Sequence, residues 1–296
     1  MGINFLFILK AIIIAIVEGL TEFVPVSSTG HMILVGDLIG FREAQNVNFS
    51  SMYEVVIQLG AILAVVVLYR KKIFTSIVEF IRYIVALITK NTKVQKETEV
   101  GFKFGINVII GSLPAMVIGL LFYDKIKSLF NIKAVGIAFI VGGLLLLIIE
   151  SWYRKNSNKR KVIKSVDDMS YRQSFIVGIF QCLAMWPGMS RSASTIMGGW
   201  VAGFTTTVAT EFTFFLAIPA MIGSSAMDLL EFDYSIMDST YWISLIIGFI
   251  IAFIVSLVVI DKFISYLKKK PMKVFAIYRV FAGILLTVLL YTNIIS

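Results

Sequence analysis

The chain is poor in charge and in the residue types that build metal or disulfide sites. Only 15% of its 296 residues are charged, and it contains one cysteine, one histidine and five prolines. A single cysteine excludes an internal disulfide, and with one histidine it excludes a zinc site of the usual Cys/His kind. The chain is instead 58% hydrophobic, with a mean hydropathy of +0.89, which leaves no surface to dissolve a water-soluble domain. The composition therefore predicts an integral membrane protein.

The apolar residues form continuous runs, which indicate helices rather than the alternating strands of a membrane barrel. Six runs approach the length of about 20 residues that spans a bilayer. The expected spans are Tyr53–Tyr69, Phe104–Tyr123, Ala134–Trp152, Val208–Met227, Tyr241–Ile260 and Val274–Tyr291. The run Ile73–Thr89 has basic flanks and is predicted to be an interfacial helix. With no long polar linker, residues 1–296 are interpreted as a single membrane domain.

Two further apolar stretches carry polar groups in their middle. They are the N-terminal region to about Leu38 and the segment Ser174–Gly203. Ionisable groups at bilayer depth cost several kcal/mol, so these stretches are poor lipid-facing spans. Each contains a proline among small polar residues, which predicts a re-entrant helix–loop–helix hairpin buried in protein or lining a watery cavity.

The two hairpins are related by an internal repeat. Val17–Pro25 followed by Ser27 lines up with Phe180–Pro187 followed by Ser190, allowing one gap. Three spans separate the copies, and an odd number inverts the second one. The predicted fold is an all-α polytopic membrane protein with about six transmembrane helices and two re-entrant hairpins in an inverted-topology repeat. Repeat one covers about 1–150 and repeat two about 170–296.

The net charge of +9 comes from three basic segments, Arg70–Lys103, Arg154–Arg172 and Lys262–Arg279. In contrast, Met227–Thr240 holds four acidic residues and no basic one. Basic loops of membrane proteins gather on the cytoplasmic side, where they face anionic lipid. We therefore expect membrane lipids rather than nucleic acid as partners, with both termini and the first hairpin on the outer side.

The first hairpin carries a group of residues suited to phosphate chemistry. Glu18 and Glu22 are one helical turn apart, and two such carboxylates favour a cation such as Mg²⁺ or Ca²⁺ between them. Ser27, Ser28 and Thr29 follow Pro25, where they cap the next helix and its free N–H groups bind a phosphate oxygen. His31 comes three residues after Ser28, and a serine beside a base is an activated nucleophile.

The second hairpin supplies an arginine ringed by hydroxyl groups. Arg191 follows a Pro-Gly turn, and its planar guanidinium suits bidentate phosphate binding. The hydroxyl groups belong to Ser190, Ser192 and Thr195, among others. A cation site, a nucleophile with a base and an anion-binding arginine together favour phosphoryl transfer on a membrane-embedded substrate.

At these residues the chain resembles the undecaprenyl-diphosphate phosphatase family, also called bacitracin-resistance proteins. The resemblance lies in Glu18-Gly-Leu-Thr-Glu22-Phe-Val-Pro-Val-Ser-Ser-Thr-Gly-His31 and Pro187-Gly-Met-Ser-Arg191-Ser-Ala-Ser-Thr195, and it extends over nearly the whole chain. It implies hydrolysis of undecaprenyl diphosphate to undecaprenyl phosphate and inorganic phosphate at the outer face of the bacterial plasma membrane. This reaction recycles the lipid carrier for cell-wall synthesis and gives bacitracin resistance.

The resemblance also implies roles for individual residues. Glu18 and Glu22 would bind metal or act in acid–base chemistry, and Ser28, with Ser27 beside it, would be the nucleophile. His31 would be a base or acid and Arg191 a diphosphate clamp. The supporting phosphate ligands would be Ser190, Ser192 and Thr195. Whether a phosphoserine forms or water attacks directly is left open, as are a homodimer and an added flippase activity.

The sequence also bears on two other classes of function. A lipid or anion transporter is favoured by the inverted repeat, because transporters use this plan heavily. The other large class of membrane lipid phosphatases relies on two separate histidines. That class is excluded because His31 is the only histidine in the chain.

Overall fold

The computed structural model describes residues 3–43, 47–129, 131–157, 162–267 and 269–292. In these residues the chain is all-helical, apart from one isolated bridge between Ile163 and Phe204. The helices longer than one turn are α1 (Phe5–Thr21), α2 (Ser28–Leu38), α3 (Val47–Leu68), α4 (Arg70–Ile88), α5 (Thr92–Leu121), α6 (Tyr123–Ser128), α7 (Ile132–Asn156), α8 (Tyr171–Gln181), α9 (Arg191–Val201), α10 (Thr206–Glu231), α11 (Ser239–Leu267) and α12 (Lys273–Tyr291). Short 3₁₀ turns η3 (Val166–Asp168), η4 (Cys182–Met185) and η5 (Tyr234–Ile236) complete the described structure.

Six of the described helices are long and apolar enough to cross a membrane, namely α3, α5, α7, α10, α11 and α12. Each contains one of the six expected spans, except that the expected ends at Tyr69 and Tyr123 lie just beyond α3 and α5. The prediction of a polytopic helical membrane protein is therefore confirmed. The protein is a multi-pass membrane protein.

The two polar stretches fold as helix–turn–helix hairpins. The first is α1 and α2, joined by a turn through Pro25, and the second is α8 and α9, joined by η4 and a turn through Pro187. Both second helices have 11 residues and begin after a serine with positive φ: Ser27 at 76° and Ser190 at 69°. The left-handed region is uncommon for residues other than glycine. The shared backbone geometry is consistent with the predicted internal repeat.

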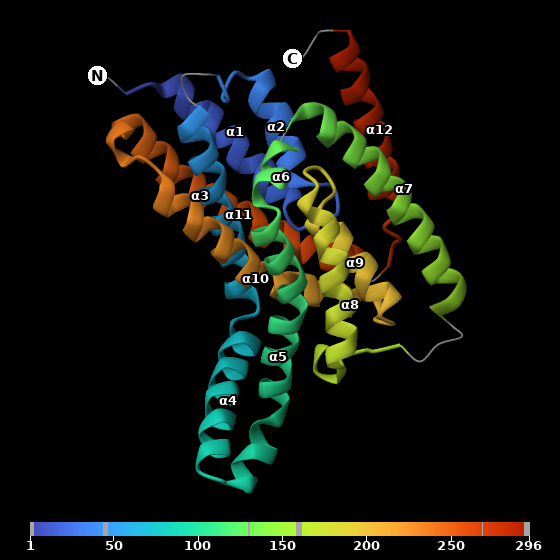
Figure 1. The fold of residues 1–296 in the computed structure, drawn as a ribbon. Helices are drawn as coiled ribbons and strands as arrows, with labels where there is room; N and C mark the ends of the chain where they lie inside the picture. Colours follow the sequence, from blue (N-terminus) through green and yellow to red (C-terminus); the bar gives the residue numbers. More distant parts are fainter. Residues whose placement is uncertain (1–2, 44–46, 130, 158–161, 268, 293–296) are drawn as a thin grey trace.

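The expected helix over Ile73–Thr89 exists as α4, but it does not lie flat across the end of the bundle. Figure 1 shows α4 running alongside the first half of α5, with both projecting away from the other helices. Close packing explains this arrangement, because Gly101 and Gly105 of α5 leave room for the side chains of Glu79 and Phe80. Helix α5 begins at Thr92, well before the expected span, where the side chain of Asn91 caps it by accepting the N–H of Val94.

The three basic segments meet at one end of the bundle. Lys72 at the start of α4 forms an ion pair with Asp167 of η3. The backbone N–H of Met272, just before α12, donates to Glu150 near the end of α7 at 2.8 Å. Residues 158–161 and 268, which belong to two of these segments, lie outside the described residues. At the opposite end, Asn4 is bonded to Thr240 of the acidic segment at 3.1 Å.

The largest core cluster surrounds the second hairpin. Trp200 of α9 and Phe212 of α10 are buried in it, and so is Phe23 from the turn of the first hairpin. Phe23 meets Phe214 of α10 edge to face, with ring centroids 5.4 Å apart. The apolar core thus fixes both hairpin turns against α10, which is what brings their polar groups together.

Candidate active site

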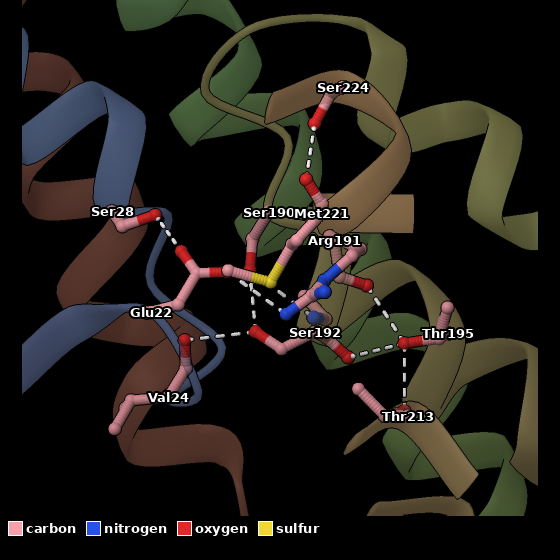
Figure 2. Close-up of polar contacts among 11 residues, drawn as sticks. Glu22, Val24, Ser28, Ser190, Arg191, Ser192, Thr195, Thr213, Met221 and Ser224 are labelled. Carbon is pink, nitrogen blue, oxygen red and sulfur yellow. Dashed lines mark hydrogen bonds and ion pairs between the residues drawn. The ribbon is translucent and has the colours of Figure 1, made fainter. Parts of the chain in front are cut away.

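The turns of the two hairpins meet in the interior of the bundle. Arg191 Nη2 of the second hairpin donates to Glu22 Oε1 of the first at 2.9 Å. Ser192 Oγ donates to the Val24 carbonyl at 3.0 Å, which adds a second bond between the turns (Figure 2). Residues 169 positions apart in the sequence therefore form one site, as the two clusters predicted.

Between the turns lies a cavity of about 200 Å³. It is lined by residues of both hairpins and by residues of α3 and α10. The lining residues are Glu22, Ser27, Ser28, Thr29, Gln58, Ala184, Pro187, Gly188, Ser190, Arg191, Ala220, Met221 and Ser224. Six of the ten predicted site residues thus face one cavity.

Ser28, Glu22 and Arg191 form a connected row at the cavity wall. The Ser28 hydroxyl donates to Oε2 of Glu22, and Arg191 donates to the other oxygen of the same carboxylate (Figure 2). Ser28 is the first residue of α2, and the Ser27 side chain makes no capping hydrogen bond. The first N–H groups of a helix have no partner within the helix and bind anions. The row therefore places a hydroxyl, its hydrogen-bond acceptor and an anion site together.

Arg191 is poised to bind an anion. Its Nε and Nη1 are buried and have no hydrogen-bond partner in the described structure, whereas Nη2 is held by Glu22. A buried donor without a partner is costly, so these two nitrogens favour an acceptor in the cavity. A phosphate group offers oxygens that suit the planar guanidinium.

Ser190, Ser192 and Thr195 form the scaffold beneath Arg191. Ser190 Oγ accepts the N–H of Ala193 at 3.2 Å and lies 3.0 Å from Ser192 Oγ. Thr195 Oγ1 donates to the Arg191 carbonyl at 2.9 Å and accepts from Thr213 of α10 at 2.8 Å. Only Ser190 of these three lines the cavity. Ser192 and Thr195 hold the start of α9 and do not face the cavity as the predicted phosphate ligands would.

The sequence spacing predicts a contact between His31 and the Ser28 hydroxyl, but the structure does not show this contact. Its Nδ1 lies 2.7 Å from the Ser27 carbonyl, and its Nε2 lies 2.7 Å from the hydroxyl of Tyr278 on α12. Both ring nitrogens are occupied, and His31 is not among the lining residues of the cavity. His31 lies on α2, but the helix turns its ring toward α12 instead of toward the Ser28 hydroxyl.

Glu18 is fully buried one turn before Glu22. Neither of its carboxylate oxygens has a hydrogen-bond partner in the described structure. It interacts electrostatically with Glu22, Glu54 and Arg191. A buried carboxylate without donors is a suitable ligand for a divalent cation. Among the described residues, however, no three Asp, Glu, His or Cys side chains cluster to hold a metal, so the protein itself offers two carboxylates.

Sequence reasoning missed several residues around the cavity. Gln58 is a polar residue among apolar ones inside the expected span Tyr53–Tyr69, which is a signal that could have found it. Arg279 was counted with a basic cytoplasmic segment, but it is fully buried in the bundle. No sequence signal pointed to Ala220 and Met221 of α10, because they look like ordinary span residues.

Comparison with known proteins shows which family the chain belongs to. The family model of the bacitracin resistance protein BacA matches residues 11–285. An undecaprenyl-diphosphatase of Clostridium perfringens (strain 13 / Type A) is 67% identical over the whole of both chains. Undecaprenyl-diphosphatase 2 of Clostridioides difficile (strain 630) is 58% identical over 100% of this chain and 99% of its own. An undecaprenyl-diphosphatase of Thermoanaerobacter pseudethanolicus is 44% identical over 98% and 99%, respectively. On the family match and these full-length relatives, the chain belongs to the bacitracin resistance protein BacA family.

Proposed function

We propose that the protein is an undecaprenyl-diphosphate phosphatase, which hydrolyses the C55 lipid diphosphate to the monophosphate and inorganic phosphate. In the cell this activity recycles the lipid carrier for cell-wall synthesis and gives bacitracin resistance. The observation that carries the proposal is the row of Ser28, Glu22 and Arg191 at one cavity inside a membrane protein. Full-length relatives with this activity in their names support the choice of substrate.

The geometry favours an attack by Ser28. Its Oγ forms a bond to the terminal phosphorus while its proton passes to the Glu22 carboxylate, which already accepts the hydroxyl. The bond from that phosphorus to the bridging oxygen breaks, and the lipid monophosphate leaves. Water then cleaves the phosphoserine, phosphate is released and Ser28 regains a proton. Direct attack by water on the same phosphorus uses the same residues.

Arg191 and the start of α2 bind the charge of the diphosphate. Two free guanidinium nitrogens and the first N–H groups of α2 are fixed before the substrate arrives, so their orientation costs nothing during the reaction. We propose that Glu18 and Glu22 would hold a divalent cation, Mg²⁺ or Ca²⁺, because the buried Glu18 carboxylate has no hydrogen-bond donor among the described residues. Such an ion would neutralise negative charge on the diphosphate.

We propose that the hairpin turns and cavity are reached from the extracytoplasmic side. The argument is the charge asymmetry: the basic segments gather at one end of the bundle, and basic loops are typical of the cytoplasmic side. The first hairpin enters from the opposite end, where Asn4 meets the acidic segment. The lipid tail would stay in the bilayer while the diphosphate enters the cavity.

The test is phosphate release from C55 isoprenyl diphosphate by the purified protein in detergent, with Mg²⁺, with Ca²⁺ and with EDTA. We expect metal-dependent turnover. Ser28→Ala and Glu22→Gln should each lower kcat by at least about 100-fold, because each removes one partner of the proton transfer. Arg191→Lys should lower kcat/KM by roughly 100-fold, because lysine cannot bind two oxygens at once.

Ser51→Ala is the matched control, because Ser51 is an exposed serine of α3 that bonds only to the carbonyl of its own helix. It should keep full activity. Rapid-quench labelling with ³²P separates the two routes, since a trapped phosphoserine requires attack by Ser28. If the intact protein releases no phosphate but moves the lipid across vesicle membranes, the transporter class is the better description.

A further inference from the structure

Two consecutive residues of α12 each contact one of the hairpin turns. Tyr278 bonds to His31 of the first hairpin, and Arg279 bonds to backbone carbonyls of the second. Neither residue lines the cavity. Two polar side chains on a lipid-spanning helix therefore contact the hairpins without reaching the cavity.

Arg279 donates hydrogen bonds to the turn immediately before Arg191. Its Nη2 lies 2.8 Å from the Met189 carbonyl, 3.0 Å from the Gly188 carbonyl and 3.3 Å from the Ala138 carbonyl of α7. The side chain is 0% exposed and forms no ion pair in the described structure. A buried unpaired charge is costly. Nη2 offsets part of this cost by donating to the Gly188 and Met189 carbonyls of the turn and to the Ala138 carbonyl of α7, whereas Nε and Nη1 have no hydrogen-bond partner among the described residues.

Close packing against α7 restricts where the Arg279 guanidinium can lie. A Cβ added to Gly142 of α7 would lie 2.8 Å from Cζ of Arg279 and 2.8 Å from Sδ of Met189. Because real Cβ atoms do not approach so closely, only glycine at this position admits the guanidinium. Arg279 therefore has little freedom to move away from the turn.

Tyr278 holds the turn of the first hairpin in the same way, but through His31, which contacts both Tyr278 and Ser27. A carbonyl oxygen only accepts, so His31 carries its proton on Nδ1 and donates it to the Ser27 carbonyl. In the neutral imidazole, Nε2 then accepts the Tyr278 hydroxyl at 2.7 Å. The two rings also stack, with an interplanar angle of 12°. The backbone of Ser27, which precedes the nucleophile, is thus tied to α12.

We infer that Tyr278 and Arg279 are positioning residues that fix the two hairpin turns relative to one another, so that Ser28 and Arg191 meet a single diphosphate. Direct bonds between the turns are few: Glu22 with Arg191, and Ser192 with Val24. The first of these weakens when Glu22 takes the Ser28 proton in the proposed reaction. The contacts with α12 do not involve the substrate and keep the turns in register through the reaction.

The inference rests on the proposed phosphatase activity for its kinetic test and has a second test that does not. In the kinetic test, Arg279→Gln should lower kcat by about 100-fold, the cost of misplacing reacting groups by about 1 Å. Arg279→Lys should restore part of this loss, because an ammonium group still donates to carbonyls. Tyr278→Phe keeps the ring and should lower kcat about tenfold, with a smaller change in KM.

Matched controls separate positioning from general stability. Tyr291→Phe removes a hydroxyl from an exposed tyrosine of the same helix and should leave kcat unchanged. Gly142→Ala changes only α7 and should reproduce the Arg279→Gln loss, because the added Cβ displaces the guanidinium from the turn. Gly223→Ala is its control, because a Cβ there meets nothing within 4 Å.

The second test measures the separation of the hairpins directly. In a Cys182→Ala background, nitroxide labels at Leu38→Cys of α2 and Ile179→Cys of α8 report that distance by pulsed electron spin resonance. Both positions are exposed. We expect one narrow distance distribution, which Tyr278→Phe broadens and Arg279→Gln broadens further. An unchanged distribution in both variants would overturn the inference, whatever the activity; a changed distribution without phosphatase activity would refute only the proposed function.

Discussion

At the scale of the residue, Glu22 is the centre of the site. One of its oxygens accepts the Ser28 hydroxyl and the other accepts Arg191. The same carboxylate therefore contacts the proposed nucleophile and the proposed anion-binding group, and it joins the two hairpins. The family resemblance points to His31 as the base beside Ser28, but in this arrangement the ring supports the Ser27 carbonyl instead.

A prediction at this scale concerns the backbone of Ser27. Its φ of 76° lies in the left-handed region, which is unfavourable for a residue with a Cβ. Ser27→Gly should therefore be more stable than Ser27→Ala by about 1 kcal/mol, because only glycine adopts this φ without a penalty. Unfolding of the purified variants in a denaturing detergent measures the difference. Equal stability of the two variants would contradict the prediction.

At the scale of the element, the turn between α11 and α12 is fixed by one buried carboxylate. Glu150 of α7 accepts the N–H of Met272 at 2.8 Å and pairs with Arg154 at 2.9 Å. A negative charge beside the start of a helix is favourable, since the helix dipole is positive there. Glu150 therefore helps to set where α12 begins, five residues before Tyr278.

Glu150→Ala should destabilise the protein by about 2 kcal/mol, because it leaves a buried N–H without an acceptor. Thermal unfolding in detergent measures the loss. Glu99→Ala is the matched control: Glu99 also pairs with a basic residue one turn later, Lys103, but this pair is exposed. Exposed pairs contribute at most about 1 kcal/mol, so this variant should stay within about 0.5 kcal/mol of the parent. Similar losses in both variants would refute a special role for Glu150.

Sequence patterns predicted the elements better than their contacts. The six spans and two hairpins follow from the length of apolar runs and the position of polar groups, which depend on local composition. The buried position of Arg279 does not follow from local composition. A count of basic residues cannot distinguish a charge at the end of a helix from one turned inward, because that choice depends on which carbonyls a distant turn exposes. For the same reason the sequence does not predict Tyr278 as the partner of His31, since it lies 247 residues away.

At the scale of the whole molecule, charge is distributed unevenly between the two ends. The projecting pair of α4 with the first half of α5, here called the arm, and the end of α7 carry basic residues (Figure 1). The end of α10 carries Asp228 and Glu231, and the connection to α11 carries Asp233 and Asp238. In the proposed orientation the first end faces the anionic inner leaflet, which attracts basic residues. The hairpin turns would then be oriented together with the rest of the bundle.

Orientation can be checked with single cysteines in the Cys182→Ala background. Ser235→Cys lies in the acidic connection and Lys93→Cys at the tip of the arm, and both residues are exposed. A membrane-impermeant thiol reagent should label Ser235→Cys in intact cells and Lys93→Cys only after permeabilisation, since basic loops stay inside. The reverse pattern would place the cavity on the cytoplasmic side.

Because its two partners lie far apart in the sequence, the ion pair between Glu22 and Arg191 can form only late in the synthesis of the chain. The two partners are separated by 169 residues. At about 5–20 residues per second, a ribosome makes Glu22 roughly ten to thirty seconds before Arg191. During that interval the first hairpin already holds two neighbouring carboxylates but not their cationic partner. The site is therefore completed only when the second half of the chain arrives, and a polypeptide truncated before α9 would leave Glu22 without that partner.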